Sequence, residues 1–442
     1  MRKDNEMKVH FASISGKKVE VAFDGGSLTS DGGVLHLRAV DRAIGLIDRL
    51  SGCIRDDRHP SYVDHSLSDL MRQRVYQIAL GYEDANDSNS LRTDPGFKMA
   101  CDRRPVTGED LASQPTISRL ENRVRRSALY RLALAFVDVF ISSYEMAPEV
   151  IILDIDDTDD QVHGGQQLSL FNGHYDEHCY MPLHIYEGRS GKLITTILRP
   201  GCRPTGAQVV MIIKRLIARI RAHWPDVKII LRGDSHFSNP EVQDYCEGHD
   251  LFYVLGQAGN ARLNALGKPL LEQALILAED QDRSVRLFSS FAYQAGSWIC
   301  PRRIIFKAEV TASGPNPRFV VTNLASSQPS FIYEQIYCAR GRMEGFIKNH
   351  KNGLQSDRTS CHRFSANQFR LFLHSAAYVL LHHLATVGLP DTKWATAQVD
   401  TIQKHLLKVG ARITELATKI KIQFPSAFPL KDLYYRLNLT LC

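Results

Sequence analysis

Four side chains that could act together on phosphate lie within one short stretch near residue 340. Tyr337, Arg340, Glu344 and Lys351 are placed at offsets of 0, 3, 7 and 14 residues. At about 100° per residue, an α-helix brings all four within roughly 60° on one face. A carboxylate can hold a metal ion, and neighbouring Arg and Lys can hold phosphates. The stretch therefore predicts a surface suited to cutting a phosphodiester.

An ordinary solvated helix face is the alternative interpretation. In that case Glu344 and Lys348 would form an ion pair one helical turn apart. Two upstream acids favour the catalytic interpretation. Each ends an apolar run typical of a buried strand, Asp156 the first and Asp234 the second.

Asp156, Asp234 and Glu344 could together form a metal site. Three carboxylates are a minimal cage for two Mg²⁺ ions about 3.5–4 Å apart. Mg²⁺ suits such a cage because it keeps several waters and takes few protein carboxylates besides substrate phosphate. The histidines and the nine cysteines show no zinc-binding spacing. We therefore expect two Mg²⁺ ions per active site, with Mn²⁺ as a substitute, and these three acids as catalytic and metal-binding residues.

The choice of acids leaves two alternatives open. Asp154 shares a strand face with Asp156, because alternate residues of a strand point the same way. Asp156 is preferred because it ends the apolar run. Asp234 could instead cap the helix predicted after it. The acids that follow the first strand are interpreted as a solvated turn: Asp157, Asp159 and Asp160.

The elements that must position these acids begin after an N-terminal region. Residues 1–25 look extended, and helical periodicity follows over 34–50, 66–82 and 116–143. Several of these helices carry basic faces. Residues 1–145 are therefore predicted to be a mainly helical DNA-binding region.

From Pro148 onward the pattern changes to strands. The predicted order is strands over 150–156, 178–186 and 192–199, a helix over 207–223, a strand over 227–234, a helix over 240–248 and a strand over 251–255. This order, followed by an acid on a later helix, matches an α/β fold of the ribonuclease-H-like type. In that fold the first and fourth strands are neighbours, so Asp156 and Asp234 could meet. The catalytic core is assigned to residues 146–258 and 329–388.

Residues 259–328 interrupt this core and alternate like antiparallel strands, which predicts a β-rich insertion. Trp298 lies within it and could stack on a base displaced from a duplex. The alternative is that Trp298 packs the insertion. Helices are predicted over 330–350, 366–386 and 398–420, so residues 389–442 are expected to form a helical C-terminal region.

Composition limits the possible classes without choosing among them. The 442 residues are 44% hydrophobic and carry a formal net charge of +6, too mild an excess to establish nucleic-acid binding. Residues 199–232, however, carry eight Lys or Arg and a single acid. No C-x-x-C pair and no secretory signal are present, which fits a reducing cytoplasm. The apolar segment 369–389 contains Arg370 and three histidines, so it is interpreted as a buried helix and not a membrane span.

The sequence resembles the DDE transposases of bacterial insertion sequences. Residues 337–351 fit the Y-(2)-R-(3)-E-(6)-K signature of a cut-and-paste superfamily, and within it the chain resembles the insertion-sequence thirteen-eighty family. Four further segments share the resemblance: 114–122, 153–159, 172–175 and 231–237. Asp157 departs from the pattern, since related enzymes often have a small residue there.

The resemblance implies a transposase that binds the ends of its element, cleaves the phosphodiester with two metal ions and transfers the 3′-ends into target DNA. Asp156, Asp234 and Glu344 would be the metal-binding triad. The nucleic-acid-binding residues would be Tyr337, Arg340, Lys348, Lys351 and Trp298. The partners would be double-stranded DNA, at the terminal inverted repeats and at the target, and a second copy of the chain. The enzyme would work in the bacterial cytoplasm at the nucleoid.

Two other functions fit the same residues. One is a ribonuclease-H-like nuclease or resolvase without strand transfer. The other is a domesticated DNA-binding protein with an inactive site, which the intact acid triad disfavours. The sequence does not specify the terminal repeat, the target site or the formation of hairpin intermediates.

Overall fold

The computed structural model describes residues 9–441. The chain forms two compact units. The terminal unit comprises Met1–Ala43, Arg58–Ser118 and His383–Cys442, and the central unit comprises Ile44–Asp57 and Arg119–His382. The predicted extension over residues 1–8 lies outside the described residues.

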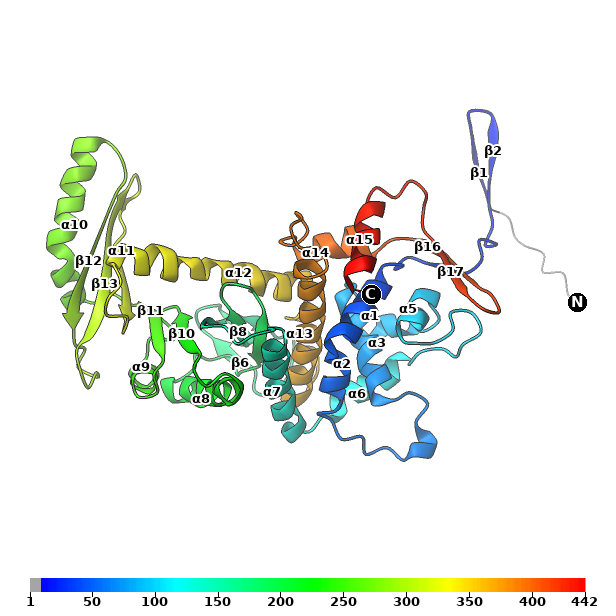
Figure 1. The fold of residues 1–442 in the computed structure, drawn as a ribbon, viewed down its shortest axis with the longest axis horizontal. Coiled ribbons are helices and arrows are strands. Elements are labelled where there is room, and N and C mark those ends of the chain that lie inside the picture. Colours follow the sequence, from blue (N-terminus) through cyan, green and yellow to red (C-terminus); the bar gives the residue numbers. More distant parts are fainter. Residues whose placement is uncertain (1–8, 442) are drawn as a thin grey trace, which may run out of the picture. The chain divides into compact units, whose positions relative to one another are not determined.

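Helices and short strands build the terminal unit (Figure 1). Its helices are α1 (Val34–Ile44), α3 (Leu67–Ala79), α4 (Ser88–Leu91), α5 (Pro95–Ala100), α14 (Val399–Ile402) and α15 (Lys431–Leu441). The strands β1 (Val9–Ile14) and β2 (Lys17–Val21) pair only with each other as a hairpin. Helix α3 begins with a capping box, in which the Ser66 hydroxyl accepts from the Asp69 N–H and the Asp69 carboxylate accepts from the Ser66 N–H.

The C-terminal region is not wholly helical, which corrects the prediction for residues 389–442. The helical segment that begins with α14 ends at Leu407, β16 (Ala411–Glu415) and β17 (Ile420–Gln423) follow as an antiparallel pair, and helical structure resumes only in α15. Strand β16 also pairs with β3 (Leu28–Thr29). The partner strand comes from nearly 400 residues earlier in the sequence, and local periodicity carries no information about such a contact.

A continuous mixed sheet forms the centre of the central unit. Its order is β12-β13-β15-β11-β10-β4-β8-β9, with β14 pairing to β13. The strands are β4 (Val150–Asp157), β8 (Leu183–Glu187), β9 (Leu193–Ile197), β10 (Lys228–Gly233), β11 (Phe252–Gln257), β12 (Val285–Tyr293), β13 (Arg302–Thr311), β14 (Gly314–Pro315) and β15 (Arg318–Thr322). Strands β4 and β10 are parallel neighbours, which confirms that the first and fourth predicted strands meet. A small separate sheet, β5 (Asp160–Gln161), β7 (Glu177–Tyr180) and β6 (Leu170–Asn172), flanks the end of β4.

The two faces of this sheet differ because side chains alternate along each strand. Ile151, Leu153 and Ile155 of β4 join the main hydrophobic core. That core is covered by helices α7 (Arg126–Ser142), α8 (Gly206–His223) and α9 (Pro240–Glu247). The intervening residues of β4, Asp154 and Asp156, belong to the opposite face, which we call the acid face.

A long helical segment covers the acid face. It comprises α11 (Pro329–Phe331), two short turns, α12 (Gly341–Lys348) and a final turn at Asn349–Gly353, and we call residues 329–353 the signature helix. Ile332 and Tyr333 at its start pack on Val254 of β11 and Ile305 of β13. In Figure 1 it runs along the sheet towards α13 (Phe364–Thr386). The sheet and this helix thus carry all three predicted acids.

The insertion is less purely β than predicted. It begins with α10 (Ala261–Gln281), a helix of 21 residues that packs on β12 and β13 (Figure 1). Strand β15 pairs antiparallel with β11, so the strands of the insertion extend the central sheet. Only three residues of α10 are fully buried, namely Leu263, Gly267 and Ala274, and Pro269 lies inside the helix.

Candidate active site

The ends of two parallel strands bring the first two acids together. In the β4–β10 register Asp154 pairs with Arg232 and Ile155 with Gly233. Asp234 follows Gly233 and therefore comes level with Asp156. Asp234 does not cap the next helix; its Oδ1 accepts from the His236 N–H at 2.9 Å.

Glu344 reaches the same place from the signature helix. Glu344 and Asp156 both line a pocket of about 370 Å³, together with Asp157, Thr158, Ile347, Lys348, Lys351 and Asn352. Glu344 lies in the first turn of α12 and is exposed. In the described part of the chain no ion pair joins Glu344 to Lys348, so the solvated-pair alternative finds no support.

The signature helix is not the regular α-helix assumed from the sequence. Residues Ile332–Tyr337 and Asn349–Gly353 form π turns, and Cys338–Arg340 forms a 3₁₀ turn. These turns change the rotation per residue, so the uniform 100° spacing was wrong in detail. The predicted grouping nevertheless holds, because Arg340, Glu344 and Lys351 all lie beside the loop that ends β4.

Two basic residues of the signature helix, Arg340 and Lys351, contact aspartates at the end of β4 and just after it. Arg340 donates through Nη2 to Asp156 Oδ2 at 2.6 Å. Lys351 Nζ lies 3.2 Å from Asp159 Oδ1 and also contacts the Asp159 carbonyl oxygen. Both contacts lie within the protein, and the expected contacts of Arg340 and Lys351 with DNA phosphates stay a prediction.

Tyr337 anchors the helix against the end of β11. A Cβ built on Gly256 would lie 2.6 Å from the Tyr337 hydroxyl and 2.9 Å from the Ser235 nitrogen. Only glycine therefore permits this close approach. Burial raises the pKa of Tyr337, opposed by Arg340 and reinforced by Asp234.

The surroundings of Asp156 favour its neutral form. Burial raises the pKa of Asp156 to about 7, Arg340 opposes this rise, and Asp234 and Asp157 reinforce it. Carboxylates this close repel one another when charged. A cation placed among them would remove that penalty.

Asp157 belongs to the site and not to a solvated turn. Its side chain is 5% exposed, and its Oδ1 lies 3.6 Å from His236 Nδ1. Its buried Oδ2 has no hydrogen-bond partner. Asp160 is also buried, which corrects the same prediction. Asp157, His236 and Arg203 line a second pocket of about 370 Å³ with the segment Asn172–Tyr175, which the resemblance had singled out.

The donor set is suited to a divalent cation. Asp156, Asp234 and Glu344 supply the oxygen ligands that Mg²⁺ prefers, and the unpartnered Asp157 oxygen points to the same need. As placed, the described residues contain no group of three acidic, His or Cys side chains arranged to hold a metal. The guanidinium of Arg340 occupies one side of Asp156 instead.

Asp154 has a different role from Asp156. It is completely buried and forms a two-point ion pair with Arg232, at 2.5 Å and 2.6 Å. It contributes to neither pocket beside the site. This arrangement favours Asp156 as the first acid. Sequence reasoning missed the role of Arg232, although its place two residues before Asp234 mirrors that of Asp154 before Asp156.

Trp298 is not placed for base stacking in this structure. It is 6% exposed and packs edge-on against Tyr293, with Arg302 5.1 Å from its ring centre. The alternative, in which Trp298 packs the insertion, describes its position.

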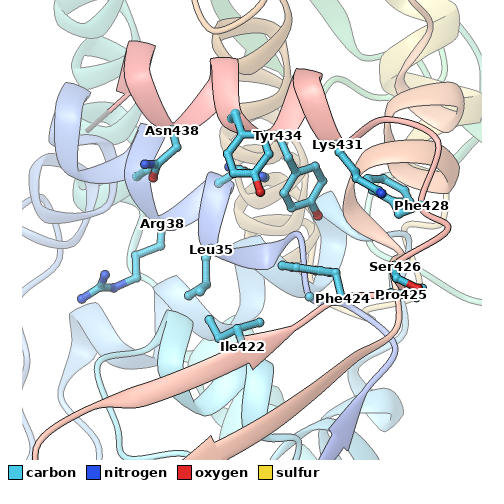
Figure 2. A pocket seen from close by; sticks show the side chains of 14 residues that line it. Leu35, Arg38, Ile422, Phe424, Pro425, Ser426, Phe428, Lys431, Tyr434 and Asn438 are labelled. Atoms are coloured by element: carbon cyan, nitrogen blue, oxygen red, sulfur yellow. The ribbon is translucent and has the colours of Figure 1, made fainter.

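A further pocket of about 690 Å³ lies in the terminal unit (Figure 2). Figure 2 shows its side chains coming from α1, from α15 and from the segment that joins β17 to α15. Aromatic rings dominate it, including Phe424, Phe428 and Tyr434. None of the three acids lines it, so pocket size does not identify the candidate site.

Comparison with known proteins identifies the family of this chain. A family model described as Transposase DDE domain group 1 matches residues 11–441. Because the match spans nearly the whole chain, the chain belongs to this family of DDE transposases. The chain is also similar to a solved chain titled as the cryo-EM structure of piggyBac transposase synaptic complex with hairpin DNA, at 13% identity and a TM-score of 0.42, covering 86% of this chain and 80% of that chain. No curated protein matches.

None of the helices described between residues 9 and 441 combines the length and apolar character of a membrane span. Helix α13, the apolar segment noted in the sequence, buries several polar side chains such as His374 and Ser375.

Proposed function

We propose that this chain is a DNA transposase that binds the ends of a mobile element, cleaves the phosphodiester in a metal-dependent reaction and transfers the 3′-ends into target DNA. One observation carries the proposal. Asp156 and Asp234 come level on neighbouring strands, and Glu344 lines the same pocket as Asp156. The adjacency of the first and fourth strands supports a ribonuclease-H-like catalytic core for this mixed sheet.

Asp156, Asp234 and Glu344 would hold two Mg²⁺ ions, or Mn²⁺ in their place. Bound metal would supply an activated water or 3′-hydroxyl and would stabilise the leaving oxygen. Asp157 is close enough to Asp156 and Asp234 to affect the same cations electrostatically.

Arg340 would exchange partners when DNA binds. In the structure it neutralises Asp156, and a divalent cation would take over that task. Its planar guanidinium would then be free to hold a DNA phosphate with two hydrogen bonds. Lys348, exposed at the same pocket, and Lys351 would hold flanking phosphates as point charges.

The proposed partners are double-stranded DNA and a second copy of the chain. DNA would be recognised at the element ends and at the target, with residues 1–145 contributing to end binding. Two copies would bridge the two ends, because each end needs an active site. The reaction would take place on the bacterial chromosome.

A gel assay with labelled element ends and Mg²⁺ tests the proposal. We expect cleaved ends joined to target DNA. Nicks without joining would indicate a nuclease or resolvase, and a mobility shift alone would indicate a DNA-binding protein. Asp156→Asn, Asp234→Asn and Glu344→Gln should each abolish cleavage and leave end binding nearly intact, because each removes a metal ligand and no positive charge. Full activity in EDTA would reject the metal-dependent mechanism.

A further inference from the structure

The residues two positions before each strand acid form a pair of their own. Asp154 precedes Asp156 by two residues, and Arg232 precedes Asp234 by two. Because alternate strand residues share a face, all four lie on the acid face. Asp154 and Arg232 are also direct partners in the β4–β10 register. The pair therefore joins the two acid-bearing strands two residues before Asp156 and Asp234.

The same arginine reaches the third acid-bearing element. Arg232 Nε and Nη2 donate to the two oxygens of Asp154, and Nη1 donates to the Ile336 carbonyl oxygen at 2.6 Å. Ile336 lies in the π turn of the signature helix, immediately before Tyr337. One guanidinium thus connects β4, β10 and the helix that carries Glu344.

This connection is sealed from solvent. The side chains of Asp154 and Arg232 are 0% and 1% exposed. A Cβ on Gly188 would lie 2.4 Å from Arg232 Nη2 and 2.6 Å from Asp154 Oδ2. The turn after β8 therefore lies directly against the ion pair, and a glycine is needed there.

Stability alone does not explain such a pair. Replacing a buried ion pair by apolar side chains of similar volume is often neutral or stabilising, whereas removing one partner is strongly destabilising. A fork-shaped donor with three fixed acceptor atoms, two on Asp154 and one on Ile336, does, however, fix the relative placement of the elements it joins.

We infer that Asp154 and Arg232 are positioning residues that hold the strands of Asp156 and Asp234 and the helix of Glu344 in the register needed to bind metal. Neither residue touches substrate or metal in this role. The inference rests on the proposed metal-dependent function.

The main test replaces both partners with apolar residues of similar size. Asp154→Leu combined with Arg232→Met should give a folded protein with an unfolding temperature near that of the parent. Its affinity for Mn²⁺, measured by electron paramagnetic resonance without DNA, should fall about 10–100-fold, as is typical when residues that orient metal ligands are changed. Cleavage should fall by a similar factor. A folded double variant with unchanged Mn²⁺ affinity would overturn the inference.

Arg232→Lys provides a second variant should the double variant not fold. Lysine keeps the charge opposite Asp154 but, as a single point donor, cannot hold Asp154 at two oxygens and Ile336 at once. We expect a folded protein with at least about tenfold weaker Mn²⁺ affinity. Parental affinity in this variant would also overturn the inference.

Arg302→Met is the matched control. Arg302 is likewise buried and paired with acids, Asp244 and Glu247 of α9, and none of its contacts is to the three catalytic acids. It should lower the unfolding temperature and leave Mn²⁺ affinity unchanged. An equal loss of Mn²⁺ affinity in this control would mean that general destabilisation is the cause. Absence of Mn²⁺ binding by the parent protein is a separate result, which would overturn the proposed function together with this inference.

Discussion

The neighbours of Asp156 have opposite effects on the charge of its carboxylate. Burial and neighbouring acids favour its neutral form, and Arg340 favours its charged form. A metal ion binds only the charged form, so metal and proton compete for this group. The competition makes the affinity for metal depend on pH in a range where ordinary aspartates are fully ionised.

The first prediction is that Mn²⁺ affinity rises with pH up to about 7 and then levels off. The pKa of Asp156 moves from the ordinary value of 3.8 to about 7, so below pH 7 each unit should cost up to about tenfold in affinity. The same pKa shift affects folding stability with the opposite dependence on pH. The raised pKa stabilises the fold fully below pH 3.8, and this contribution is lost as pH rises through about 7.

Isothermal titration calorimetry between pH 5.5 and 8 would measure this dependence. Proton release on Mn²⁺ binding should be largest below pH 7. Asp156→Asn should weaken binding and remove most of the pH dependence. A flat profile in the parent protein would show that Asp156 is already charged at pH 5.5.

The second prediction concerns Arg340 and Lys351. If each holds a phosphate, its replacement by alanine should weaken binding to cleaved ends and lower the salt slope of affinity by about one unit. Arg340→Lys should also be impaired if the contact is two-pronged. Lys268→Ala is the matched control, because Lys268 is exposed on α10 beside Glu272. Fluorescence anisotropy at several salt concentrations gives the slopes, and unchanged slopes in both alanine variants would limit the role of the signature helix to Glu344.

At the scale of elements, local patterns and distant contacts differ in how well they can be predicted. The two strands were predicted from apolar runs ending at Asp156 and Asp234, because each run encodes its own burial. Their adjacency was predicted from the order of elements, which matches a fold in which the first and fourth strands are neighbours, and β4 and β10 do pair. The π turns of the signature helix did not follow, since they depend on how the helix docks on β11 and β13. Strand β16 was missed for the same reason, because its partner β3 is remote in sequence.

The candidate site also has features that local sequence predicts and features that it does not. Spacing alone grouped Glu344 with Arg340 and Lys351, and the structure places them at the end of β4. The direct Arg340–Asp156 contact could not be predicted, because it depends on the three-dimensional approach of helix and sheet. Packing of Trp298 into the insertion was one of the two alternatives left open by the sequence, because Trp298 lies between β12 and β13 and no local periodicity specifies what covers it.

The third prediction tests how closely the signature helix must approach the sheet. Gly256→Ala would place a methyl group 2.6 Å from the Tyr337 hydroxyl. Such overpacking should cost about 1–3 kcal/mol of stability and should lower cleavage, because the helix of Glu344 would be displaced. Adding Tyr337→Phe should recover part of both losses, and the remaining clash with the Ser235 nitrogen would prevent full recovery.

Gly296→Ala serves as the control for this series, because a Cβ there meets no atom within 4 Å. Thermal unfolding and the cleavage assay would be measured on the same preparations. A Gly256→Ala protein with parental stability and cleavage would show that the helix can shift without consequence.

At the scale of the whole molecule, the proposed function determines the expected stoichiometry of the reaction. Under that proposal each chain carries one triad and an element is cut at two ends, so we expect coordinated cleavage to use two chains. The fourth prediction is therefore a dimer in the complex with two element ends. Light scattering on purified complexes should give two protein chains per pair of ends, and one chain per cleaved pair would contradict the proposal.

An experiment with mixed dimers tests whether both chains of the dimer cut DNA. When parent protein is mixed with an equal amount of Glu344→Gln protein, about a quarter of randomly formed dimers carry two intact sites, because each chain is drawn independently from the two kinds. Both-end cleavage should then fall to about that fraction of the value for parent protein alone, while the total number of cut ends should fall only to about half. Glu344→Gln changes no positive charge, so it should still bind ends and enter dimers. If the total number of cut ends and the amount of both-end product fall by the same factor, one chain cuts the two ends in turn.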